Sequence, residues 1–492
     1  MFASTQAWGA SGVAMDVMAA AADTPERLAA RQAARLRALV AHAQSASPLM
    51  ARRLAGIDPA RAVLADLPVS HRGELMAHFA DWVTDPVLDL AALRAFTADP
   101  TLVGQPFAGR YTVWESSGTS GVPGMFVQDP GAMAVYDALE WLRRSEPDPW
   151  RHWLNPLGLG ERWAFIGATG GHFASLVTLE RLLQRHPAIK PMVRAFTIQQ
   201  PTAGLVAELE DFAPTVVATY PTVAGLLADE AAAGRLAWRP REVWTGGETL
   251  SPALRRHIGT HLGAALRNSY GASEFLPMGW ECRHGALHLN ADWVILEAVD
   301  AEGRPVPPGE FSHSALLTNL ANKVQPLLRY ELGDRIRFAP ERCACGAALP
   351  VVEVMGRLDD PLRMAGPHGT EVTLLPMALS TVLEDDAGVY DFELEQRDAH
   401  TLVLKLPHDL PDVQQALDRG CRMLREFAAQ QGVQRPEVIG ELVHEACARG
   451  RSGKARRVHG PGSAPASAPG SAPPGTGRPA AKRPRATPRA GR

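Results

Sequence analysis

The chain has 492 residues, of which 46% are hydrophobic and 21% are charged. This composition is that of a globular protein large enough for more than one core. A formal net charge of -3 gives no indication of a nucleic-acid or membrane-surface partner. Five cysteines are too few for a disulfide scaffold and favour a reducing, cytoplasmic compartment. No stretch approaches the roughly 18 apolar residues of a spanning helix, and the start lacks the basic segment of a secretory signal.

Three regions differ in composition. Residues 1–355 are predicted to form a large domain and residues 356–459 a small C-terminal domain. Residues 460–492 are rich in Gly, Pro, Ala and Ser and contain only basic charges. Such a segment buries too little apolar surface to fold, so we predict a disordered tail. Its basic residues favour either a solvated appendage or weak binding to an acidic partner.

The first predicted helix begins at Thr24-Pro25-Glu26. Thr24 suits the N-cap, proline suits the first helical position, and Glu26 complements the helix dipole. A stripe of apolar residues at helical spacing follows, namely Leu28, Leu36, Leu39, Val40 and Ala43. The stripe predicts one buried helix face.

Further along the chain, short apolar runs alternate with helical patterns. Strands are predicted over 163–166, 215–218, 242–244 and 264–266. Each is followed by a polar or Gly-rich turn, and the pattern predicts an α/β fold with α/β layers. Ligands in such folds bind beyond the carboxyl ends of the strands. The turns expected there cover 167–171, 220–221, 245–248 and 268–271.

The segment Ser116-Ser117-Gly118-Thr119-Ser120-Gly121 has the composition of an anion-binding loop. Glycines let backbone N–H groups approach a phosphate, and hydroxyls add donors. No Lys-Ser/Thr pair follows, so it is not a Walker-type loop. Taken alone, such a segment is more often an ordinary loop.

Downstream motifs favour the phosphate-binding interpretation. SSGTSGVPG resembles the phosphate loop of the adenylate-forming superfamily, which contains acyl-CoA synthetases, peptide-synthetase adenylation domains and luciferases. Four further motifs of that superfamily follow in the right order. They are Tyr270-Gly271-Ala272-Ser273-Glu274, Tyr330-Glu331-Leu332-Gly333-Asp334, Gly356-Arg357-Leu358-Asp359-Asp360 and Ser452-Gly453-Lys454. Five ordered motifs are far more specific than any one of them.

Within the superfamily, the chain is most similar to phenylacetate–CoA ligases. Leu67-Pro68-Val69, Tyr220-Pro221, the Gly-Gly-Glu turn and the phrase YGASEF resemble that branch. Most superfamily members have lysine after the proline of the phosphate loop, whereas this chain has Gly124 after Pro123. Phenylacetate–CoA ligases commonly lack that lysine too, so the departure agrees with the branch.

The resemblance implies roles for the matching residues. Residues 116–121 would hold the β- and γ-phosphates of ATP, and Thr119 is counted as catalytic with Glu274 and Lys454. Glu274 would bind Mg²⁺, a hard cation that prefers carboxylates. Lys454 would bridge the carboxylate and the α-phosphate. Tyr270 would pack on adenine, with Gly247 and Glu248 lining the same pocket, and Asp334 would accept hydrogen bonds from the ribose. The other nucleotide-site predictions are Gly271, Ala272, Ser273, and Arg335 or Arg357 as an assisting cation.

The implied reaction has two steps. Adenylation converts a carboxylate into an acyl-adenylate, which requires positioning and electrostatic stabilisation more than a protein nucleophile. The small domain would then rotate about Asp359 and admit a thiol. We therefore predict an ATP-dependent carboxylate–CoA ligase acting on an aryl or arylacetic acid such as phenylacetate. An acceptor other than CoA (a carrier-protein thiol, an amine or a hydroxyl) and a non-catalytic nucleotide- or zinc-binding relative remain as alternatives.

A metal site is also predicted. Cys343 and Cys345 form a close thiol pair, and Cys282 lies near His284 and His288 in sequence. Three cysteines and one histidine satisfy the tetrahedral preference of structural zinc. Some phenylacetate–CoA ligase relatives carry such a zinc, and we prefer His288 to His284 as the fourth ligand. Free buried cysteines are the alternative.

The expected partners are a small carboxylic acid, ATP and CoA, with no nucleic acid and no membrane. A homodimer is left open. His172 follows Gly170-Gly171 and is either a residue of the acyl pocket or a structural histidine.

Overall fold

The computed structural model describes residues 10–116, 124–143, 160–355, 361–408, 410, 412–443 and 457–460. Several predicted residues lie outside these ranges. They are Ser117, Gly118, Thr119, Ser120, Gly121, Arg357, Asp359, Lys454 and all of the predicted tail except Gly460.

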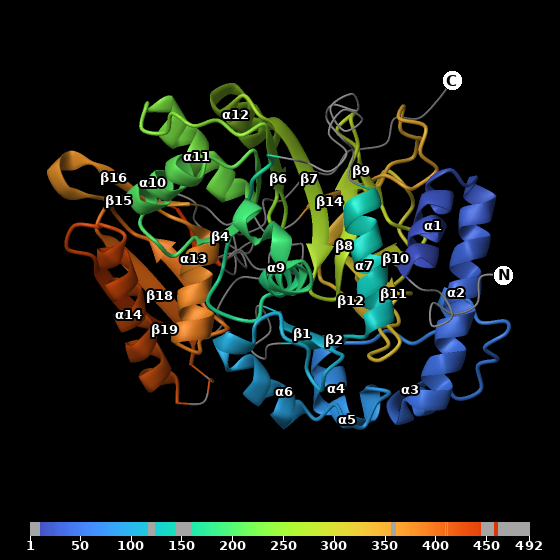
Figure 1. The fold of residues 1–492 in the computed structure, drawn as a ribbon. Helices are drawn as coiled ribbons and strands as arrows, with labels where there is room; N and C mark the ends of the chain where they lie inside the picture. Colours follow the sequence, from blue (N-terminus) through green and yellow to red (C-terminus); the bar gives the residue numbers. More distant parts are fainter. Residues whose placement is uncertain are drawn as a thin grey trace, which may run out of the picture.

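A seven-stranded sheet forms the centre of the fold (Figure 1). Its strands lie in the order β4-β3-β5-β6-β7-β8-β9. The first five in that order are parallel, and β8 and β9 are antiparallel. The strands are β3 (Trp163–Gly167), β4 (Val193–Thr197), β5 (Val216–Thr219), β6 (Glu242–Thr245), β7 (Ala265–Ala272), β8 (Phe275–Glu281) and β9 (Leu287–Leu289). The connecting helices are α9 (Ala174–Arg185), α10 (Thr202–Phe212), α11 (Pro221–Ala232) and α12 (Pro252–Leu262).

The α/β fold class predicted from the sequence is confirmed, and the four predicted strands correspond to β3, β5, β6 and β7. The turn predicted over 268–271 is wrong, because β7 continues to Ala272. After Asn268, the last residue paired with β6, the strand pairs antiparallel with β8, for example Ser269 with Trp280. The polar residues of this segment therefore lie on a strand.

Helices of the N-terminal part cover one side of the molecule. The helix predicted at Thr24 is confirmed: Thr24 accepts from the Arg27 amide, and the predicted apolar stripe is buried. Two strands, β1 (Thr112–Glu115) and β2 (Met125–Gln128), pair antiparallel and flank the predicted phosphate loop. The helices are α1 (Ala10–Ala21), α2 (Pro25–Ala46), α3 (Pro48–Arg53), α4 (Arg72–Ala77), α5 (Phe79–Trp82), α6 (Leu90–Thr97) and α7 (Pro130–Leu142).

Five strands between the seven-stranded sheet and residue 355 form two small antiparallel sheets. The first contains β10 (Val294–Val299), β11 (Ser314–Asn319) and β12 (Tyr330–Glu331), and the second contains β13 (Arg335–Phe338) and β14 (Val352–Met355). Asp334 lies between these two sheets in the chain.

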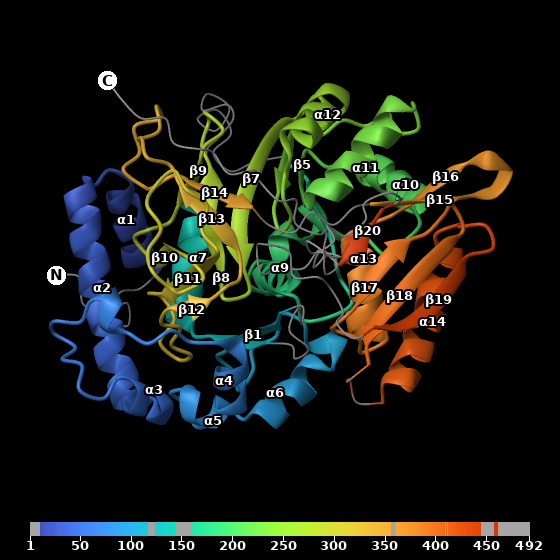
Figure 2. The same ribbon diagram turned by 180° about the vertical axis from the view of Figure 1, so that it is seen from behind.

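The C-terminal elements form a hairpin and a separate sheet. β15 (Leu362–Ala365) pairs with β16 (Glu371–Leu374). A four-stranded sheet in the order β19-β18-β17-β20 carries α14 beside it (Figure 2). The sheet is preceded by α13 (Pro376–Thr381) and a π-helical turn (Val382–Asp386). The strands and helix that follow are β17 (Glu393–Gln396), β18 (Thr401–Pro407), α14 (Val413–Gln430), β19 (Glu437–Val443) and β20 (Val458–His459).

These C-terminal elements share a buried apolar cluster with part of the central sheet. The cluster contains Leu379 and Phe392 as well as Ile166 of β3 and Val217 of β5. The predicted domain boundary at residue 355 stays a prediction. Within the described ranges, none of the helices has both the length and the apolar composition that a membrane crossing needs.

Candidate active site

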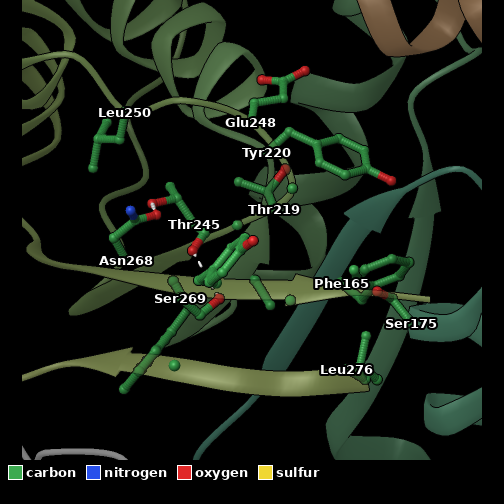
Figure 3. Close-up of a pocket in the computed structure, with 18 of the residues that line it drawn as sticks. Phe165, Ser175, Thr219, Tyr220, Thr245, Glu248, Leu250, Asn268, Ser269 and Leu276 are labelled. Atoms are coloured by element: carbon green, nitrogen blue, oxygen red, sulfur yellow. Dashed lines mark hydrogen bonds between the residues drawn. The ribbon is translucent and has the colours of Figure 1, made fainter. Parts of the chain in front are cut away.

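A cavity of about 2000 Å³ includes in its wall the carboxyl ends of β5 and β6, Ala168 directly after β3, and the polar part of β7. This is the edge at which α/β folds bind ligands. Figure 3 shows part of its wall, where the side chains of Thr245 and Asn268 face each other at 3.1 Å. Nine of the predicted nucleotide-site residues line it: Ser116, Gly247, Glu248, Tyr270, Gly271, Ala272, Ser273, Glu274 and Asp334.

The turn after β6 is held in place by Glu248. Its carboxylate accepts from the Thr222 amide at 3.0 Å and from the Thr222 hydroxyl at 3.1 Å. Gly247 has a φ of 81°, a value that favours glycine. A Cβ there would lie 3.2 Å from the Tyr220 ring. At Gly247 the turn therefore presents backbone rather than a side chain to the cavity.

Tyr270 and Asp334 meet in the wall of the cavity. The tyrosine hydroxyl donates to Oδ2 of Asp334 at 2.9 Å, and both residues are buried. Burial, together with the nearby Asp334 charge, raises the pKa of Tyr270 far above its ordinary value. The phenol therefore stays protonated and remains a donor at neutral pH.

Gly271 allows two backbone segments to approach. A Cβ on this residue would lie 2.0 Å from the carbonyl oxygen of Leu276, a distance at which the strands could not keep their pairing. The β7–β8 hairpin therefore requires glycine at this position, and the hairpin carries Tyr270 and Glu274.

Glu274 is only 4% exposed and has a cationic neighbour that the sequence did not indicate. Nη2 of Arg72 lies 3.4 Å from Oε1 of Glu274, and Nε of Arg72 donates to the Tyr330 hydroxyl at 3.1 Å. A buried carboxylate needs such a partner or a metal. Arg72 also lines the cavity.

The segment that carries Arg72 is tied to the motif around Tyr330. The Ser70 amide donates to the Arg329 carbonyl at 3.0 Å, and the Glu331 amide donates to the Ser70 carbonyl at 3.0 Å. Ser70 directly follows Leu67-Pro68-Val69, one of the phrases that resemble phenylacetate–CoA ligases. That phrase, together with the Glu-Leu-Met at 74–76 that follows it in the same resemblance, was the sequence signal near Arg72.

Two hydrogen bonds join the two ends of the predicted phosphate loop, Ser116 and Gly124, which together are called the loop neck. The Ser116 amide donates to the Gly124 carbonyl, and the Gly124 amide donates to Oγ of Ser116, both at 2.9 Å. Nε1 of Trp114 donates to the Ser273 carbonyl at 2.8 Å. The start of the loop therefore lies beside Glu274.

Two arginines take different positions relative to the cavity. Nε of Arg335, a predicted nucleotide contact, donates to the Ser312 carbonyl at 2.9 Å, and the residue does not line the cavity. Arg457, which was not predicted, does line it. Its guanidinium lies 2.6 Å from Oε1 of Glu384, and both side chains are buried. Glu384 belongs to the π-helical turn, a feature common at functional sites.

The predicted zinc ligands converge. One ligand atom from each of Cys282, His288, Cys343 and Cys345 lies within 4.8 Å of all the others. The Sγ atoms of Cys282 and Cys343 are 3.7 Å apart, close to the roughly 3.8 Å that tetrahedral geometry gives for zinc–sulfur bonds of about 2.3 Å. Nε2 of His288 lies 3.3 Å from Sγ of Cys345.

The second ring nitrogen of His288 is also satisfied. Nδ1 lies 2.9 Å from the Leu349 carbonyl, the kind of contact that orients a metal-binding imidazole. His284 is exposed, and its Nε2 lies 3.2 Å from Nε of Arg283. The structure therefore brings His288, and not His284, to the three cysteines.

His172 lies away from the cavity wall. It is 2% exposed, its Nε2 is 3.0 Å from the Asp99 carbonyl, and its ring lies 5.3 Å from that of Phe96. Of the two interpretations left open, the structural one fits this position.

Comparisons with known proteins agree with this fold. No protein-family model matches the chain. Among solved structures, 2-hydroxyisobutyryl-CoA ligase in complex with 2-HIB-AMP and CoA has a TM-score of 0.54 at 22% identity, over 89% of this chain and 91% of that chain. The fold is therefore that of the adenylate-forming ligases.

Two of the curated relatives are phenylacetate-coenzyme A ligases. The chain is 28% identical to the phenylacetate-coenzyme A ligase of Thermus thermophilus over 380 residues, 73% of this chain and 77% of that protein. It is also 28% identical to the phenylacetate-coenzyme A ligase of Pseudomonas putida over 216 residues, 41% of this chain and 44% of that protein. The chain is thus similar to phenylacetate–coenzyme A ligases over most of its length, in agreement with the resemblance that the five motifs indicated.

Proposed function

We propose that the chain is an AMP-forming carboxylate–CoA ligase, which activates an aryl or arylacetic acid such as phenylacetate through an acyl-adenylate. The observation that carries this proposal is the convergence of Glu274, Asp334, Glu248 and the neck of the phosphate loop on one cavity. Homology to phenylacetate–coenzyme A ligases over most of the chain supports the same reaction.

Different residues of this chain would bind different parts of ATP. Asp334, held by Tyr270, would accept hydrogen bonds from the ribose, and the turn at Gly247 and Glu248 would border the adenine. The loop from Ser116 to Gly121 would bind the β- and γ-phosphates. Glu274 would hold Mg²⁺, which neutralises phosphate charge when bound. Arg72 keeps the Glu274 carboxylate oriented.

Lys454 would bridge the substrate carboxylate and the α-phosphate. Only three positions of sequence separate it from Arg457, which lines the cavity. This proximity in the sequence supports a lysine close to the reacting groups. Rotation about Asp359, with Arg357 beside it, remains part of the proposal for the second step.

We also propose a structural zinc at Cys282, His288, Cys343 and Cys345. The donor set, its spacing and the orientation of His288 fit a closed tetrahedral site. The zinc would join the β8–β9 turn to the loop that carries Cys343 and Cys345.

A screen of pyrophosphate release over carboxylic acids, run with and without CoA, tests the proposal. Release that depends on an arylacetic or aryl acid, with thioester formed only when CoA is present, is the expected result. Pyrophosphate release without any CoA thioester would point to another acceptor. Absence of carboxylate-dependent release, or full activity of Lys454→Ala, would contradict the proposed chemistry.

A further inference from the structure

Three buried carboxamide side chains lie at every third position, beginning with the last residue of β11. Asn319, Asn322 and Gln325 are 0%, 1% and 0% exposed. Polar groups buried to this extent are costly unless each finds partners. Their partners in other parts of the chain are β2, the chain around Glu274, and Tyr136 of α7.

Asn322 and Gln325 bind the edge of β2 that faces away from β1. Oε1 of Gln325 accepts from the Val127 amide, and its Nε2 donates to the Met125 carbonyl, both at 2.9 Å. Nδ2 of Asn322 donates to the Val127 carbonyl and to Oε1 of Gln128, both at 2.8 Å. The two side chains therefore take the place of a neighbouring strand, supplying both donors and acceptors to β2.

Asn319 binds the chain around Glu274. Its Nδ2 donates to the Glu274 carbonyl at 2.9 Å and to the Tyr136 hydroxyl at 2.8 Å. Its Oδ1 accepts from the amides of Ala321 and Asn322 at 3.0 and 3.1 Å. All four hydrogen-bonding positions of this carboxamide are thus used, which fixes its orientation.

β2 and the chain around Glu274 flank the phosphate loop. β2 begins directly after Gly124, whose amide closes the loop neck on Ser116. On the other side of the loop, Trp114 of β1 donates to the carbonyl of Ser273, next to Glu274. The loop ends and the Glu274 backbone are therefore fixed to one frame, and the three carboxamides form one side of it.

We propose that Asn319, Asn322 and Gln325 act as positioning residues, a carboxamide clamp that sets the phosphate loop relative to the Mg²⁺-binding glutamate. This inference rests on the proposed function. Carboxamides suit the task because each supplies a donor and an acceptor without adding a charge beside the triphosphate. None of the three lines the cavity, so they act through the groups they hold.

The test is binding of Mg·ATP and of AMP to Gln325→Met, measured by titration calorimetry together with the unfolding midpoint. The substitution keeps the side-chain length and removes both contacts to β2. We expect the Kd for Mg·ATP to rise by about tenfold, which is about 1.4 kcal/mol of binding free energy, because the loop ends would lose their fixed position. The Kd for AMP, which lacks the β- and γ-phosphates, should stay unchanged. If Gln325→Met does not fold, Asn322→Ala is measured in its place.

Gln44→Met is the matched control, because Nε2 of Gln44 donates to the Leu54 and Ile57 carbonyls, each at 2.9 Å, away from the cavity. It should lower the unfolding midpoint and leave both Kd values unchanged. Unchanged Mg·ATP affinity in folded Gln325→Met, or an equal loss for Mg·ATP and AMP, would overturn the clamp alone. A wild-type chain that binds neither nucleotide would overturn the proposed function and the clamp together.

Discussion

Tyr270 donates its hydroxyl to Asp334 at 2.9 Å, although 64 positions separate the two residues. Tyr270→Phe leaves a buried carboxylate oxygen without this donor, which costs about 1–3 kcal/mol of folding free energy. We expect lower stability in denaturant and a higher KM for ATP, because the ribose-binding carboxylate loses its orientation. Tyr111→Phe is the control, since Tyr111 donates to Asp85 at 2.6 Å outside the cavity. Equal KM values in the two variants would contradict the assignment.

Arg72 is the second residue to test. Arg72→Met removes the cation beside Glu274 and the donor to Tyr330. We expect the adenylation rate at saturating Mg·ATP to fall by about a hundredfold, the order that a lost electrostatic contact in an active site costs. Arg52→Met is a suitable control, because Arg52 pairs with Asp81 at the surface, where its side chain is 58% exposed, and such pairs contribute little. A fully active Arg72→Met would show that Glu274 is held by other groups.

The metal site gives a prediction that is independent of catalysis. Elemental analysis of the purified chain should find about one zinc per chain. Cys345→Ser and His288→Ala should lose the metal and unfold at lower temperature, because binding energy in a closed site is folding energy. His284→Ala should keep both the zinc and the unfolding temperature. Zinc retained after loss of His288 would show that another fourth ligand is used.

The buried pair of Arg457 and Glu384 predicts a large effect on stability. Arg457→Met leaves the Glu384 carboxylate buried without its cation, which costs about 3–5 kcal/mol. The free energy of unfolding in denaturant measures this loss, and adding Glu384→Gln should recover part of it. Arg397→Met is the matched control, since its pair with Glu441 is 48% and 40% exposed. Equal losses in Arg457→Met and Arg397→Met would contradict the role of burial.

Local patterns in the sequence predicted much of the central sheet. The strand at 163–166 is a continuous apolar run followed by turn residues, and the N-cap at Thr24 is a contact within one helical turn. The turn predicted over 268–271 was wrong because polarity alone was used. Whether a polar segment forms a strand depends on whether another strand pairs with it. The pairing strand here is β8, which contains Pro277 and was not predicted from the sequence.

The candidate site, too, was predicted from the sequence only in part. The zinc ligands were predicted from residue type, although Cys282 and Cys343 are 61 positions apart. Arg72 was missed because its contact with Glu274 spans 202 positions, and one arginine on a short helix has no distinguishing pattern. Asn319 was missed for a related reason: an amide in an apolar run indicates a buried polar group but not its partner.

The C-terminal sheet contains the two strands that precede and follow Lys454 in the chain. β19 and β20 are its outer strands, so the end of one and the start of the other lie about three strand spacings apart, roughly 14 Å. The connection between Val443 and Val458 has far more contour length than this span requires. Lys454 lies eleven positions after Val443 but four before Val458. Val458, which pairs with Leu394 of β17, is therefore the strand residue nearer to Lys454 in sequence, so an insertion between Lys454 and Val458 should impair adenylation more than one between Val443 and Lys454.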